Sequence, residues 1–174
     1  MFKMTDKKTN FEKVLEFNKA FGVETNTSTP ENLFTKYEKL LTLRKNLIKE
    51  EFNELVDSIE QKDLIEYRDA VADILYVTYG AATAVGLDAD HAFDIVHKSN
   101  MSKLCLSEEE AKITVQDYLE KYKTKQSPYD SPTYRKSPDD KYWVVYNKST
   151  NKILKSINYT PADLTNVNDF KDKY

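Results

Sequence analysis

Two groups of acidic residues lie on the apolar faces of two successive predicted helices, and this arrangement limits what the chain can fold into. The first group is Glu50, Glu51 and Glu54, and the second is Asp69 and Asp73. An α-helix advances by about 100° per residue, so each group forms one patch on its helix. Leucines continue the first patch upstream, and small apolar residues continue the second downstream. We therefore predict that the carboxylates face the interior of a helical bundle.

Buried carboxylates are costly unless a cation neutralises them, because each unpaired charge loses several kcal/mol of hydration. Carboxylate oxygens are the ligands that Mg²⁺ prefers, and Mn²⁺ is the alternative metal. For one cluster alone, a solvated acidic face beside lysines is the competing interpretation. Two clusters on neighbouring antiparallel helices favour a shared metal site. The predicted metal ligands are Glu50, Glu51, Glu54, Asp69 and Asp73.

Hydrophobic periodicity and capping residues predict a largely helical chain. Asp63 with Glu66 and Ser107 with Glu110 have the spacing of capping boxes, and Gly86 before Leu87 is typical of a helix C-terminus. The second helix, opened by Pro30, has apolar residues on two sides and must be covered by its own chain or by a second subunit. The five predicted helices cover approximately residues 11–21, 30–59, 64–86, 88–104 and 107–122.

The character of the chain changes after Ser127. Prolines interrupt an irregular segment, and two β-rich runs then flank the turn-like residues 148–151, which predicts a β-hairpin. An isolated hairpin is marginal in water, so we expect it to pack on the helices or on a partner subunit. The predicted division is an all-α domain over residues 1–126 and an extension over residues 127–174.

Composition excludes several classes of protein. A net charge of -3 and a pI of about 5.5 argue against nucleic acid as the main partner. The apolar run over residues 74–87 is shorter than the roughly 20 residues that span a bilayer, so no membrane contact is expected. The single Cys105 cannot form an internal disulfide, and the polar opening lacks the apolar core of a signal peptide. These features predict a cytoplasmic protein.

The segment VHKSNMSKL offers four further candidate residues, His97, Lys98, Asn100 and Lys103. His97 shares a helical stripe with Phe93 and Met101, which favours a core histidine over a ligand. Asn100 and Lys103 lie one turn apart, and an amide with an ammonium suits a polyphosphate. The competing interpretation of Lys103 is a surface lysine.

Five motifs occur along the chain: KEEFNEL, ADILYVTYG, GLDAD, VHKSNMSKL and KILKSINYTPADL. Together they resemble the all-α nucleoside triphosphate pyrophosphohydrolase superfamily. This group includes MazG-like proteins, phosphoribosyl-ATP pyrophosphohydrolases and dimeric dUTPases. The resemblance implies a four-helix-bundle catalytic core with extra helices and, here, a small C-terminal β-hairpin. It also implies a homodimer or a dimer of dimers.

The resemblance carries roles over by position. Glu51 and Glu54 match the ExxE pair that holds Mg²⁺, and Asp73 matches the final aspartate of a later ExxD pair. The first acid of that pair would fall at Ala70, which cannot bind metal, so Asp69 is the expected substitute. Glu50 and Glu51 are the expected catalytic carboxylates, and Asn100 and Lys103 the expected contacts to substrate phosphates.

The expected activity is Mg²⁺-dependent hydrolysis of a nucleoside triphosphate, such as dUTP, to a monophosphate and pyrophosphate in nucleotide-pool house-cleaning. One alternative is hydrolysis of phosphoribosyl-ATP. Another is a non-catalytic helical dimer that binds nucleotide or metal. The sequence leaves open which nucleotide is preferred, which phosphorus is attacked and how many metals are bound.

Overall fold

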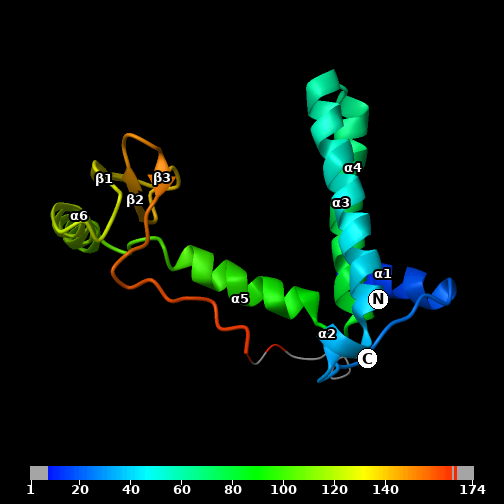
Figure 1. Ribbon diagram of the computed structural model, residues 1–174. Helices are drawn as coiled ribbons and strands as arrows, with labels where there is room; N and C mark the ends of the chain where they lie inside the picture. Colours follow the sequence, from blue (N-terminus) through cyan, green and yellow to red (C-terminus); the bar gives the residue numbers. More distant parts are fainter. Residues whose placement is uncertain (1–7, 166, 168–174) are drawn as a thin grey trace, which may run out of the picture. The chain divides into compact units, whose positions relative to one another are not determined.

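The computed structural model describes residues 8–165 and residue 167. The chain divides into two compact units, Met1–Phe93 with Thr165–Tyr174, and Asp94–Leu164. The described residues form six helices and a three-stranded antiparallel sheet near the C-terminus (Figure 1). The prediction of a largely helical chain with a small β element is confirmed. In this part of the chain, no helix is both long and apolar enough to cross a membrane.

A long helical hairpin dominates the first unit. Helices α3 (Glu38–Gln61) and α4 (Leu64–Ala84) lie side by side along their length, and α1 (Asn10–Ala20) packs against α4 (Figure 1). Only two residues connect α3 to α4, so the helices run antiparallel. The hairpin therefore brings the two acidic sequence motifs onto neighbouring helices.

The helix ends largely follow the predicted capping residues. Asp63 accepts hydrogen bonds from the N–H groups of Ile65 and Glu66 at 2.9 and 3.2 Å, which opens α4. The reciprocal half of the predicted capping box does not form, because the Asp63 N–H donates to the Ser58 carbonyl at 2.9 Å. Asp63 is therefore a simple N-cap.

The C-terminus of α4 is a Schellman motif, as predicted. Gly86 has φ +73°, and the Leu87 N–H donates to the Ala82 carbonyl at 3.1 Å. Leu87 also packs against the apolar cluster that contains Ala82. The next helix, α5 (Ala89–Met101), opens where Asp88 accepts a hydrogen bond from the His91 N–H at 3.0 Å. The chain passes from the first unit to the second within α5.

The single long helix predicted from Pro30 is wrong at its beginning. A short helix, α2 (Leu33–Lys36), comes first, and α3 begins only after Tyr37. Tyr37 has φ -108° and ψ 23°, outside the α-helical region, and neither helix has a side-chain N-cap. Without an N-cap, nothing in the sequence fixes where the first turn of α3 starts.

A small apolar cluster and a buried polar pair join α1 to α4. Phe11 and Leu15 pack with Ala82 in the core of the first unit. Beside them, the buried Asn18 side chain donates a hydrogen bond to Thr83 Oγ1 at 2.8 Å. Because both side chains are buried, this bond offsets the loss of hydration that either group would suffer alone.

Arg44 is an unusual buried residue of the α3–α4 hairpin. Its side chain is only 8% exposed, and its Nε and Nη2 atoms have no hydrogen-bond partner in the described part of the chain. Burial lowers the pKa of Arg44. A Cβ atom built on Gly80 would lie 3.1 Å from Arg44 Nη1. Gly80, in the interior of α4, therefore leaves room for the guanidinium group.

This packing predicts that Gly80→Ala has opposite effects on stability in the wild-type chain and in an Arg44→Met chain. In the wild-type chain, Gly80→Ala should destabilise the protein by about 1 kcal/mol, because the new methyl group displaces the guanidinium. In an Arg44→Met background, the same change should stabilise by about 0.5–1 kcal/mol through helix propensity. Denaturant unfolding of the four proteins measures the coupling. Additive free energies of unfolding would contradict the described contact.

The second unit is built around α6 and the sheet. Helix α6 (Glu108–Lys123) packs against β1 (Pro132–Lys136) and β2 (Trp143–Asn147), and β3 (Lys152–Ile153) pairs with the far edge of β2. The predicted hairpin of β2 and β3 is confirmed.

Strand β1 was not predicted. Its segment contains three prolines and was expected to be irregular. Pro132 is the first residue of this edge strand, a position where the missing N–H is tolerated, and Pro138 lies beyond its end. A proline-punctuated segment can therefore still supply an edge strand.

The core of the second unit joins the loop after α5 to the sheet. Cys105, Val145 and Leu154 are buried together, and the backbone of Cys105 exchanges two hydrogen bonds with Trp143, at 2.9 and 2.8 Å. Ser107 caps α6 by accepting from the Glu110 N–H at 3.1 Å. The unit thus has its own core, apart from that of the helical hairpin.

Candidate active site on the helical hairpin

The five predicted metal ligands lie on α3 and α4, and the chain exposes them to different degrees. Glu51 and Asp73 are half-buried, whereas Glu50, Glu54 and Asp69 are exposed. Partial burial is thus found for one carboxylate on each helix, and the predicted inward orientation of all five stays a prediction.

The negative charges of three other carboxylates act on Glu51. Burial raises the pKa of Glu51, and the charges of Glu54, Asp73 and Glu50 raise it further. A hydrogen bond between the carboxyl groups of Glu51 and Glu54 contributes in the same direction. Because Asp73 lies on α4, the hairpin brings carboxylates from both sequence motifs into one region of negative potential.

The chemistry of this donor set fits a hard divalent cation. The donors are carboxylate oxygens from two helices, and a cation would offset the mutual repulsion that raises the pKa of Glu51. Within residues 8–165 and 167, no three His, Cys, Asp or Glu side chains converge closely enough to enclose a metal. The carboxylates are gathered in one region but are not arranged as a closed coordination shell.

The later acidic motif departs from the family pattern at a structurally constrained position. Ala70, where the pattern would have an acid, is only 1% exposed. A carboxylate there would be buried. Asp69 is exposed and is not among the charges that most affect the pKa of Glu51. Its role as a substitute ligand stays a prediction.

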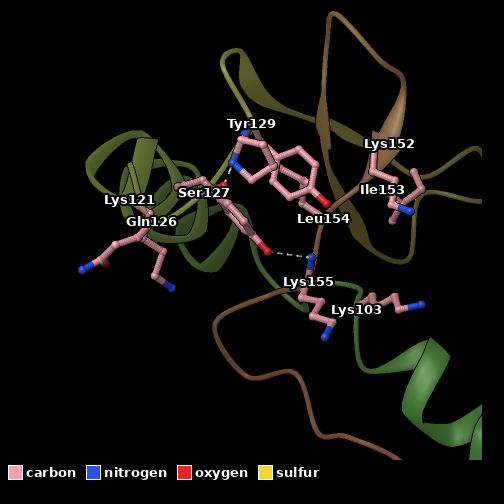
Figure 2. A pocket seen from close by; sticks show the side chains of 11 residues that line it. Lys103, Lys121, Gln126, Ser127, Tyr129, Lys152, Ile153, Leu154 and Lys155 are labelled. Carbon is pink, nitrogen blue, oxygen red and sulfur yellow. Dashed lines mark hydrogen bonds between the residues drawn. The ribbon is translucent and has the colours of Figure 1, made fainter. Parts of the chain in front are cut away.

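Asn100 and Lys103 lie in the second unit, where they contact each other. Lys103 Nζ donates a hydrogen bond to Asn100 Oδ1 at 2.7 Å. Lys103 also lines a cavity together with three other lysines, which sequence spacing did not reveal (Figure 2). The prediction that His97 is a core residue is wrong, because its side chain is exposed and Phe93 on the same stripe is 68% exposed.

Comparison with known proteins identifies the family of this chain. Residues 14–100 match the sequence model of the family described as phosphoribosyl-ATP pyrophosphohydrolase. The chain is a member of that family. The matched region contains α3, α4 and every acidic residue of the candidate site. The phosphoribosyl-ATP pyrophosphohydrolase family belongs to the MazG-like all-α superfamily, so the resemblance predicted from the sequence is confirmed.

A relative matches almost the whole chain. The "Uncharacterized protein L479" of Acanthamoeba polyphaga mimivirus is 30% identical, across 89% of this chain and 94% of its own length. The likeness therefore extends beyond the matched family region. Family membership supports a pyrophosphohydrolase, a hydrolase of phosphoric anhydride bonds.

Proposed function

We propose that this protein hydrolyses a nucleoside triphosphate, such as dUTP, to a nucleoside monophosphate and pyrophosphate, with Mg²⁺ as cofactor. The observation that carries the proposal is the concentration of negative charge at Glu51 from carboxylates on both helices of the matched family region. Such a region repels a triphosphate unless a divalent cation lies between them. House-cleaning of the nucleotide pool in the cytoplasm is the proposed cellular role.

The proposed roles follow from position on the hairpin. Glu51, Glu54, Asp73 and Glu50 would hold the cation, with Asp69 beside them. Bound Mg²⁺ (or Mn²⁺) supplies charge neutralisation of the phosphates and lowers the pKa of a coordinated water.

The remaining roles belong to the chain's own groups. The Glu50 carboxylate accepts a proton from the attacking water. The water oxygen bonds to one of the two phosphorus atoms that share the bridge between the first and second phosphates. The bond from that phosphorus to the bridging oxygen breaks, and the bridging oxygen leaves with the other product. For Asn100 and Lys103, which lie in the second unit, the phosphate-binding role stays a prediction from the sequence.

Phosphoribosyl-ATP is a second candidate substrate. The observation that favours it is the family match itself, which carries the name of this activity. The bond broken and the carboxylates used would be the same, so the candidates differ only in the group attached to the phosphates.

A non-catalytic binding protein is the third candidate. The buried Ala70 and the absence of a closed cluster of metal ligands among the described residues favour it. Such a protein would bind nucleotide without turnover.

A homodimer is proposed as the assembly, with a dimer of dimers as the larger form. Large apolar side chains along α3 and α4 are exposed in the single chain, with exposed fractions of 55% for Phe52, 58% for Ile59 and 74% for Ile65. A helical hairpin of this kind buries such a surface only against another element. A second copy presents the same apolar face and can cover it.

The test is a substrate panel with detection of pyrophosphate. Purified full-length protein with Mg²⁺ should release one pyrophosphate per monophosphate from at least one of dUTP, dCTP or phosphoribosyl-ATP. EDTA should abolish the reaction. Preference for phosphoribosyl-ATP would select the second candidate. Tight nucleotide binding in calorimetry without pyrophosphate release would select the third and overturn the enzymatic proposal.

A further inference from the structure

The second unit contains a cavity of about 580 Å³ whose lining is strongly basic. Four lysines reach it from three places in the chain. Lys103 follows α5 and Lys121 lies on α6, whereas Lys152 lies on β3 and Lys155 just after it. Figure 2 shows Lys103 and Lys155 near each other. Among the described residues that line the cavity, there is no Asp or Glu.

Most of this positive charge is not neutralised by the unit itself. Lys121 forms an ion pair with Asp117, with Nζ and Oδ2 separated by 2.6 Å. In the described part of the chain, no ion pair with a carboxylate is formed by Lys103, Lys152 or Lys155. Three positive charges therefore remain around one cavity, and their repulsion would be offset by a multiply charged anion.

The wall of the cavity is aromatic and apolar. Tyr118 and Tyr129 meet edge to face, with ring centroids 5.8 Å apart, and Ile153 and Leu154 lie beside them. The Tyr118 hydroxyl accepts a hydrogen bond from the Lys155 backbone N–H at 3.2 Å, which fixes the ring against the segment just after β3. A planar ring can pack on this wall while a charged group reaches the lysines.

We propose that this cavity is a second nucleotide site, which binds the phosphates of a nucleoside triphosphate with its lysines and the base against Tyr129. The volume lies within the roughly 300–1,000 Å³ typical of small-molecule sites. Every lining residue lies beyond residue 100, outside the matched family region. Lys103 is the one lining residue that the proposed activity also uses, and the test below varies Lys152 and Lys155 instead, so the proposal goes beyond the proposed activity and does not depend on it. A nucleic acid is disfavoured, because the basic residues surround one cavity and the chain's net charge is -3.

The experiment measures binding to the full chain in EDTA, where the acidic site lacks the cation that would attract phosphates. The probes are inorganic tripolyphosphate and dUTP, and calorimetry measures their binding. The wild type should bind one molecule of either probe per chain. The double variant Lys152→Gln/Lys155→Gln should bind both at least about tenfold more weakly, because two ammonium groups are lost from the cavity.

Matched controls separate the cavity from general charge effects. Lys141→Gln/Lys148→Gln removes the same charge from the same unit outside the cavity and should change binding less than twofold. Tyr129→Leu should weaken dUTP binding but not tripolyphosphate binding. Glu51→Gln should bind both probes as the wild type does, which keeps this test separate from the proposed activity. Thermal unfolding of each variant establishes that it is folded.

Four results would overturn the proposal. The first is a wild-type chain that binds neither probe in EDTA. The second is an equal loss of binding in the Lys141/Lys148 control. The third is a single-stranded oligonucleotide that binds more tightly than dUTP and loses its affinity in the Lys152/Lys155 variant. If Tyr129→Leu leaves dUTP binding unchanged, the base does not use the aromatic wall and the nucleotide assignment is wrong.

Discussion

The Glu51→Gln variant is expected to release pyrophosphate with a kcat/KM at least about 100-fold below that of the wild type. Glu51 is half-buried, and the charges of Glu54, Asp73 and Glu50 act on it. The amide keeps the shape of the side chain but removes the charge that holds the cation. Steady-state assays at saturating and at limiting Mg²⁺ measure the loss.

Glu60→Gln is the matched control for this prediction. Glu60 is an exposed acid on the same helix, nine residues after Glu51, and therefore lies on the opposite side of α3. Its variant should keep wild-type activity within about twofold, as is typical of a surface change. Equal activity of the Glu51 and Glu60 variants would refute the assignment of the site.

The Gly86→Ala substitution is expected to cost about 3 kcal/mol or more of unfolding free energy. Gly86 has φ +73°, a conformation that a residue with a Cβ adopts only with strain. A Cβ there would also lie within 2.4–2.6 Å of the backbone of Ser28. Backbone atoms cannot rotate away as the end of a side chain can, so the loop and the end of α4 must separate.

Gly22 provides a control with the same backbone conformation and no contact. Its φ is +66°, and a Cβ built there meets nothing within 4 Å. Gly22→Ala should therefore cost only the conformational term, about 1 kcal/mol. Denaturant unfolding gives both values. If the two variants lose the same stability, the contact with Ser28 has no energetic consequence.

Local signals in the sequence predicted most helix boundaries. The N-caps Asp63 and Ser107 and the Gly86 terminus each depend on a few neighbouring residues, and all three are confirmed. The break at Tyr37 and the strand at Pro132 were missed because no such local signal marks them. The break has no capping signal, and the strand forms only because β2 lies beside it.

The candidate site was predictable where helical spacing controls it. The ExxE spacing places Glu51 and Glu54 on one face, and the short α3–α4 connection brings Asp73 near them. Arg44 has no such signal, because its burial depends on Gly80 of another helix. The lysine cavity was also beyond sequence analysis, since it joins residues about fifty positions apart.

The most direct test of the account is a Mn²⁺ titration of the full chain. Electron paramagnetic resonance monitors the titration, because free and bound Mn²⁺ give distinct signals. The wild type should bind Mn²⁺, and Mg²⁺ should displace it. Asp73→Asn should weaken that binding at least about tenfold, because it removes the carboxylate that α4 contributes. Equal Mn²⁺ affinity in the wild type and Asp73→Asn would show that the two helices do not share a cation.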